Sequence, residues 1–129
     1  TPAIQPMSET IQDHTSRWLR TMPIVRGTLA RGIRFADERF VSDGDDETFS
    51  ASALQAAWRL VADAFQVLRA QHLPPTRLTW VHERTVLHFV QRADGAILGV
   101  IVTKKSAGVD TAGLEQLLTG FQSKAPPAA

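Results

Sequence analysis

The sequence contains no cysteine, and this absence excludes several kinds of chemistry at once. Disulfide frameworks, thiolate metal sites, cysteine nucleophiles and thiol redox motifs all need the thiol group. A chain without cysteine fits a reducing compartment, so we expect a cytoplasmic protein. A long apolar run is also missing, since the longest one is about as long as a strand, whereas a membrane-spanning helix needs roughly 20 apolar residues. We therefore expect no direct insertion into a membrane.

An excess of one charge is missing as well. Fourteen Lys and Arg residues against thirteen Asp and Glu leave a formal net charge of +1, and the basic residues are scattered along the chain. Nucleic acids and anionic membranes are bound by clustered basic side chains. The sequence therefore predicts no nucleic-acid partner.

The motifs of nucleotide-dependent and hydrolytic enzymes are not found in the sequence. Its 8 glycines are dispersed and form neither a Walker loop nor a dinucleotide fingerprint. No serine lies in a Gly-x-Ser-x-Gly elbow, and spacing alone assigns no Ser-His-Asp set. We expect no catalytic residue, no cofactor and no enzymatic activity. A small enzyme whose site is recognisable only by its geometry is the remaining alternative.

Two groups of residues share some features with metal sites. His82 and His88 flank an expected hairpin turn, but no third ligand is placed beside them, and specific zinc sites use at least three protein ligands. The acidic run at residues 43–47 does not match the ligand spacing of an EF-hand. We expect two ordinary strand histidines, a solvated loop and no bound metal.

The composition is that of a folded domain. The chain has 129 residues, 43% of them hydrophobic and 21% charged, which suits one domain with a core of its own. The ends, residues 1–7 and 123–129, contain prolines that interrupt regular structure, and we expect them to be tails. The predicted domain covers residues 8–122.

Three segments have the periodicity of amphipathic helices. The first covers residues 8–22. The second and strongest covers residues 54–68, where apolar residues at steps of three and four draw one stripe and Ser50 or Ser52 can cap the start. The third follows Asp110, which can cap it. Pro23 ends the first helix, and Pro74 and Pro75 end the second.

Five runs rich in β-branched and apolar residues indicate strands. They lie at residues 24–35, 40–41, 76–82, 85–92 and 96–104. The last run is apolar without alternation, which is typical of a strand buried on both faces near the middle of a sheet. The expected fold is therefore α+β, a five-stranded antiparallel sheet flanked by helices in the order α-β-β-α-β-β-β-α.

The large aromatic side chains fall on the long helix and on the strand after it. Trp58 and Phe65 belong to the apolar stripe of the helix, where core packing is the ordinary role. Trp80 differs, because the alternation of Leu78, Trp80 and His82 gives one face of its strand a mixed character that suits an interface.

The order of these elements resembles the roadblock/dynein light chain family, which has a profilin-like fold. The resemblance covers about residues 8–122 and is carried by topology and hydrophobic pattern. It includes the long capped helix, the Pro-Pro break, the strand Arg77-Leu78-Thr79-Trp80 and the Asp94-Gly95 hairpin before the last strand. The chain departs from the family at residues 26–31, which lack a strongly apolar strand, and at Asp37-Glu38, where Asp-Gly is typical.

The resemblance implies a homodimer, or a heterodimer with a similar domain, in which the long helix and the following strand pair with their counterparts. It also implies a scaffold or regulator of a small Ras-like GTPase or of a motor or signalling complex. On this basis we place Trp58, Phe65, Leu78, Trp80 and His82 at a dimer interface. The alternative is a small-molecule sensing module of the PAS or GAF type, which builds a similar sheet and keeps a cavity beside it.

Overall fold

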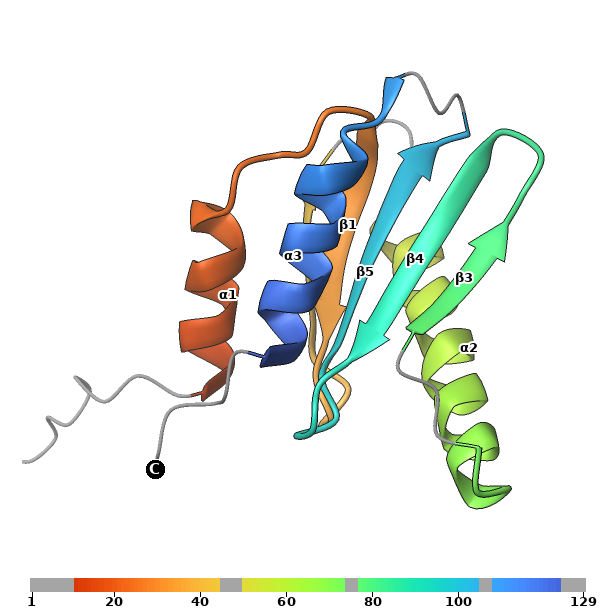
Figure 1. Cartoon of the computed structure of the whole chain (residues 1–129). Helices are drawn as coiled ribbons and strands as arrows, with labels where there is room; N and C mark the ends of the chain where they lie inside the picture. The colour runs from red at the N-terminus through yellow and green to blue at the C-terminus, as the bar shows by residue number, and fades with distance from the viewer. Residues whose placement is uncertain (1–10, 45–49, 74–76, 105–107, 124–129) are drawn as a thin grey trace, which may run out of the picture.

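The computed structural model of the chain has an α+β fold and describes residues 11–44, 50–73, 77–104 and 108–123 (Figure 1). The predicted class, the order of elements and the single five-stranded antiparallel sheet are confirmed. The predicted cap Ser8, the residues Pro74 and Pro75 and the acidic residues 45–47 lie outside the described ranges. In chain order the elements are α1 (Ile11–Thr21), β1 (Thr28–Arg34), β2 (Phe40–Gly44), α2 (Ala51–Ala70), β3 (Arg77–Val81), β4 (Thr85–Gln91), β5 (Ile97–Thr103) and α3 (Thr111–Ser123).

The middle of the sheet is β5, as its unalternating apolar sequence predicts. The strand order is β2-β1-β5-β4-β3, and all neighbouring strands are antiparallel. The first strand is shorter than predicted, because the chain turns ahead of it. There the amide of Thr28 donates to the carbonyl of Val25 at 3.0 Å, and Gly27 has a φ of 94°, a left-handed conformation that favours glycine.

Helices cover both faces of the sheet. Figure 1 shows α1 and α3 on one face and α2 on the other. The side chains of β5 alternate between two cores, with Leu98, Val100 and Val102 packed among residues of α1 and α3, and Ile97 and Ile101 packed beneath α2. The structure is therefore three layers thick, and its central strand is buried from both sides.

The long helix α2 starts where the sequence predicts. The side-chain oxygen of Ser50 accepts a hydrogen bond from the amide of Ala53 at 3.2 Å, so Ser50 is the N-cap. At the other end the amide of Leu73 donates to the carbonyl of Leu68 at 2.8 Å, and His72 has a φ of 62°. This backbone arrangement closes the helix and satisfies its last carbonyls.

Trp58 packs against the sheet where two glycines lie opposite each other. Gly32 of β1 and Gly99 of β5 are direct partners in the ladder, and the indole nitrogen of Trp58 donates to the carbonyl oxygen of Gly32 at 3.1 Å. The rings of Phe40 and Phe89 meet Trp58 edge-on, with centroids 5.4 and 5.1 Å away. Aromatic side chains thus fill the space between sheet and α2 where a PAS or GAF module keeps its ligand.

Arg31 explains why the first strand departs from a strongly apolar sequence. Its side chain is only 1% exposed and points from β1 to the end of α1. There its Nη2 atom donates to the carbonyl oxygens of Leu19 and Met22, each at 2.9 Å, and its Nη1 atom donates to that of Pro23 at 3.2 Å. Carbonyls at a helix C-terminus lack internal donors and carry partial negative charge, so a buried arginine caps α1 at this point.

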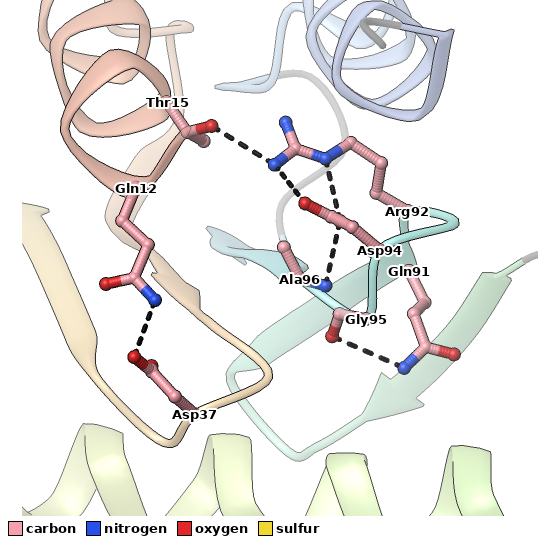
Figure 2. A network of polar contacts seen from close by, with 8 residues as sticks. All are labelled: Gln12, Thr15, Asp37, Gln91, Arg92, Asp94, Gly95 and Ala96. Atoms are coloured by element: carbon pink, nitrogen blue, oxygen red, sulfur yellow. Dashed lines mark hydrogen bonds and ion pairs between the residues drawn. The ribbon is translucent and has the colours of Figure 1, made fainter. Parts of the chain in front are cut away.

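A second buried arginine, Arg92, fastens α1 to the β4–β5 hairpin (Figure 2). It donates to both carboxylate oxygens of Asp94, at 2.9 and 2.7 Å, and to the hydroxyl of Thr15 at 3.1 Å. Its guanidinium also lies 4.9 Å from the centroid of the Phe121 ring in α3. The hydrogen bonds from Arg92 hold the pKa of Asp94 below its usual value. One side chain therefore joins both helices of this face to the sheet.

The glycine seat predicts that Gly99→Ala is strongly destabilising. An added Cβ at Gly99 would lie 2.5 Å from ring atoms of both Phe89 and Trp58, and overpacking of a core costs about 1–3 kcal/mol or more. The control is Gly108→Ala, where the nearest atom, in Thr103, lies at 3.7 Å. Urea unfolding of the two variants measures the difference, and an equal free energy of unfolding would contradict the tight seat.

Candidate interaction surface

The last strand of the sheet on one side, β3, has an unusually bare edge. In the described part of the chain its one neighbour is β4. The amide of His82 donates to the carbonyl of Thr85 at 2.8 Å, so by the alternation of an antiparallel ladder Arg77, Thr79 and Val81 direct their N–H and C=O groups outward. An edge of this kind is a template for pairing with another strand.

The side chains of β3 do little to protect this edge. Trp80 is 41% and Val81 60% exposed, whereas natural edge strands are usually guarded by charges, prolines or bulges. The strand contains one charged residue, Arg77, which is bound to Glu115 of α3 through two hydrogen bonds of 2.7 and 2.8 Å. These bonds raise the pKa of Arg77 and lower the pKa of Glu115. The charge nearest the edge is thus already paired.

An apolar stripe of α2 lies beside β3 and is exposed. The buried stripe of α2 contains Leu54, Trp58, Val61 and Phe65. A second series begins one residue before each of these positions and continues three residues further to Val67. In it Leu60 is 57% and Val67 60% exposed. Such a spacing is typical of a helix that packs against another helix. The second stripe consists of Ala53, Ala57, Leu60, Ala64 and Val67.

The opposite flank of α2 is polar. It faces the β1–β2 hairpin and presents residues such as Arg59, Asp63 and Gln66 around shallow hollows shared with Arg34. Hydrophobic exposure on α2 is therefore concentrated on the side of β3. We call the second stripe of α2 together with β3 the α2–β3 face.

A groove runs between the two parts of the α2–β3 face. A cavity of about 430 Å³ lies between Leu60 and Ala64 of α2 and Leu78 and Trp80 of β3. Another cavity, of about 380 Å³, lies nearer the start of the helix, between Ala53 and His82. Both are open to the surface. The face is therefore hollowed as well as apolar, which suits the side chains of a protein partner.

The five residues predicted for a dimer interface occupy two different places. Trp58 and Phe65 are 0% exposed, so they pack in the core of their own chain and we correct their assignment to an interface. Leu78 is half-buried at the groove, and Trp80 and His82 are exposed beside it, with ring centroids 5.4 Å apart. The sequence analysis missed the second stripe of α2. The same sequence shows it, because apolar residues also recur at steps of four and three when the count starts at Ala53.

The two histidines weighed as a metal pair are not brought together. His82 is opposite Thr85 at the hairpin, while His88 is opposite Thr79, so their side chains lie on opposite faces of the sheet. His88 points toward α3, and its Nδ1 atom is buried without a hydrogen-bond partner among the described residues. Burial, and then the positive charge of Arg77, lower the pKa of His88, although Glu115 acts in the opposite direction.

This environment predicts that His88 destabilises the fold at acidic pH. An unfolded histidine binds a proton near pH 6.5, whereas folded His88 resists protonation. As the pH falls below about 6.5, the unfolded state gains protons that the folded state does not, so the free energy of unfolding decreases. His88→Gln should weaken this decrease. Urea unfolding between pH 7.5 and 5 measures it, and parallel curves for the two proteins would show that His88 has no such effect.

Comparison with known proteins identifies the fold, which is the roadblock/longin-like α+β fold. The chain is similar in structure to MglB of Myxococcus xanthus, with a TM-score of 0.57 and 12% sequence identity over 75% of this chain and 85% of that chain. A second solved structure, MglC from Myxococcus xanthus, has a TM-score of 0.44 and 18% identity over 78% of this chain and 89% of that chain. No protein-family model and no curated protein matches the sequence.

None of the helices within residues 11–44, 50–73, 77–104 and 108–123 combines the length and the apolar character needed to cross a bilayer. The apolar stripes of α2 are confined to one side of the helix, as in a helix that packs against protein.

Proposed function

We propose that this chain is a non-catalytic protein-interaction module that pairs with a similar domain through the α2–β3 face. The observation that carries the proposal is the coincidence of two features, an exposed apolar stripe on α2 and an unguarded sheet edge beside it. Each feature alone is common on protein surfaces, but contiguous apolar patches are typical of interaction sites. Pairing at β3 would join two sheets into one and cover both features together.

We further propose that the paired module is a scaffold or regulator of a small Ras-like GTPase. The support is the resemblance of the sequence to the roadblock family together with the roadblock/longin-like fold. The chain itself has no phosphate-binding loop, so its effect on nucleotide hydrolysis would be exerted through a partner. Its role would lie in the surfaces that it presents rather than in a pocket.

Trp80 provides the direct test of the α2–β3 face. Trp80→Ala should weaken association by about 2 kcal/mol or more, the range of interface hot spots, because the side chain is 41% exposed and would become buried on pairing. Sedimentation equilibrium measures the dissociation constant, and urea unfolding measures the stability. Gln66→Ala, on the polar flank of the same helix, is the matched control and should leave association unchanged.

The opposite result for Trp80 has a clear meaning. If Trp80→Ala lowers the free energy of unfolding by roughly 3–5 kcal/mol, the cost of truncating a core tryptophan, and leaves association unchanged, Trp80 is a core residue. The α2–β3 face would then not be the binding surface.

The GTPase proposal predicts an effect that needs two proteins. The chain alone should release no phosphate from GTP, whereas addition to its cognate Ras-like GTPase should change the rate of hydrolysis or of nucleotide exchange. A phosphate-release assay with the small GTPases of the same organism, each with and without the chain, measures this. Hydrolysis by the chain alone would revive the enzyme alternative, and an unchanged rate across all of these GTPases would contradict the regulatory role.

A further inference from the structure

We infer that a hollow beside the polar flank of α2 is a binding site for a small molecule that carries a carboxylate or phosphate group. The hollow has a volume of about 350 Å³ and lies between the second half of α2, the end of β1 and the β4–β5 hairpin. We call it the Arg34 hollow. It is on the side of α2 away from β3, so the inference goes beyond the proposed function and does not depend on it.

Arg34, the last residue of β1, is an enclosed cation with little compensation. Its side chain is only 18% exposed, because it lies between Phe40 and Ile97 of the neighbouring strands and beside α2. In the described part of the chain its one ionic contact is with Glu38, at 3.8 Å, which is too long for a hydrogen bond. The N–H donors of an enclosed guanidinium need acceptors, and Glu38 does not supply one at this distance.

Two buried arginines show how this chain otherwise compensates such a group. Arg31 has three carbonyl oxygens within 3.2 Å, and Arg92 has both carboxylate oxygens of Asp94 within 2.9 Å. No described residue offers Arg34 an acceptor at a comparable distance. The hollow is open to the surface, so water reaches Arg34, but water brings no compensating charge. An anion bound in the hollow would supply both the acceptor and the charge.

A second guanidinium is held at the rim of the Arg34 hollow. The Nη2 atom of Arg69 in α2 donates a hydrogen bond to the Oε1 atom of Gln91. The Nε2 atom of Gln91 in turn donates to the carbonyl oxygen of Gly95 at 3.5 Å, as Figure 2 shows. A guanidinium has several N–H donors, so the bond to Gln91 orients Arg69 and leaves donors for a ligand. Two guanidinium groups around one hollow suit the oxygens of a carboxylate or a phosphate.

The other residues of the wall define the size and charge of the ligand. Among the described residues that line the hollow, Asp63 is the one carboxylate, so two cations and one anion leave a net charge of +1. Phe35 and Ile97 add apolar surface, against which a short carbon chain can pack. The volume of about 350 Å³ is within the range of small-molecule sites. The hollow therefore suits a small anion and not a polyanion such as nucleic acid.

Titration with inorganic phosphate and, separately, with succinate tests the site. Both are followed by the NMR signals of backbone amides, with ionic strength held constant by sodium chloride. Saturable shifts should be centred on Ala36 and Gly95, which line the hollow. Arg34→Gln should weaken binding by about 10-fold or more, because a charge-assisted hydrogen bond is lost, and Arg69→Gln should weaken it as well. The matched control is Arg20→Gln, which removes the same charge from the exposed side of α1 and should leave affinity unchanged.

Saturation by either probe supports the site, and the probe that binds identifies the acidic group that the site accepts. Absence of saturable shifts with both probes would overturn the inference. So would an equal loss of affinity in Arg20→Gln and Arg34→Gln, since net charge alone would then explain the binding. If urea unfolding shows that Arg34→Gln does not fold, the exposed Arg69→Gln decides, and an unchanged affinity in this variant overturns the site. Sedimentation of Arg69→Gln should match the unaltered chain, so failure of this site leaves the pairing proposed for the α2–β3 face intact.

Discussion

The seat of Trp58 on the glycine pair is the interaction on which the rest of the arrangement depends. Gly32 and Gly99 face each other on neighbouring central strands. A Cβ added at Gly99 would meet the indole of Trp58, and one added at Gly32 would meet the ring of Phe40 that packs against this indole. The hydrogen bond from the indole to Gly32 then sets the rotation of α2 about its own axis. Because a helix is rigid, this rotation determines which of its other residues face the solvent and which face β3.

The rotation of α2 explains why the core and the α2–β3 face lie next to each other. The two stripes of the helix are offset by one residue, or about 100° around the axis, so seating the first against the sheet turns the second toward β3. On the opposite face of the sheet, Arg31 and Arg92 bind α1 through hydrogen bonds from buried guanidinium groups, and Arg92 also lies over the Phe121 ring of α3. Such charges are tolerated in a core when acceptors compensate them, as the carbonyls at the end of α1 do for Arg31 and the carboxylate of Asp94 does for Arg92.

The sequence was sufficient to predict the elements, a serine cap at Ser50 or Ser52 and the central position of β5. It was insufficient where orientation decides the role of a side chain. Trp58 and Trp80 were both expected at an interface, but Trp58 is buried because its indole reaches Gly32 of β1. This contact joins residues far apart in the sequence, and periodicity does not show it. Arg31 is a similar case, since a polar residue inside a strand gives no signal in sequence that a helix end needs it 12 residues away. The second stripe of α2 was different, because the steps from Ala53 to Val67 are visible in the sequence itself.

A bare apolar edge is normally an aggregation hazard, and the difference between the two edges of this sheet limits that hazard. Strand pairing grows without limit when each added copy exposes the edge that the next one needs. Here the two edges of the sheet differ, because β3 is apolar while β2 ends in Ser42, Asp43 and Gly44. The pairing proposed for β3 would cover this apolar edge and leave β2 as the outer edge of each domain. A pair formed in this way would present no second apolar edge, so pairing would stop at two domains.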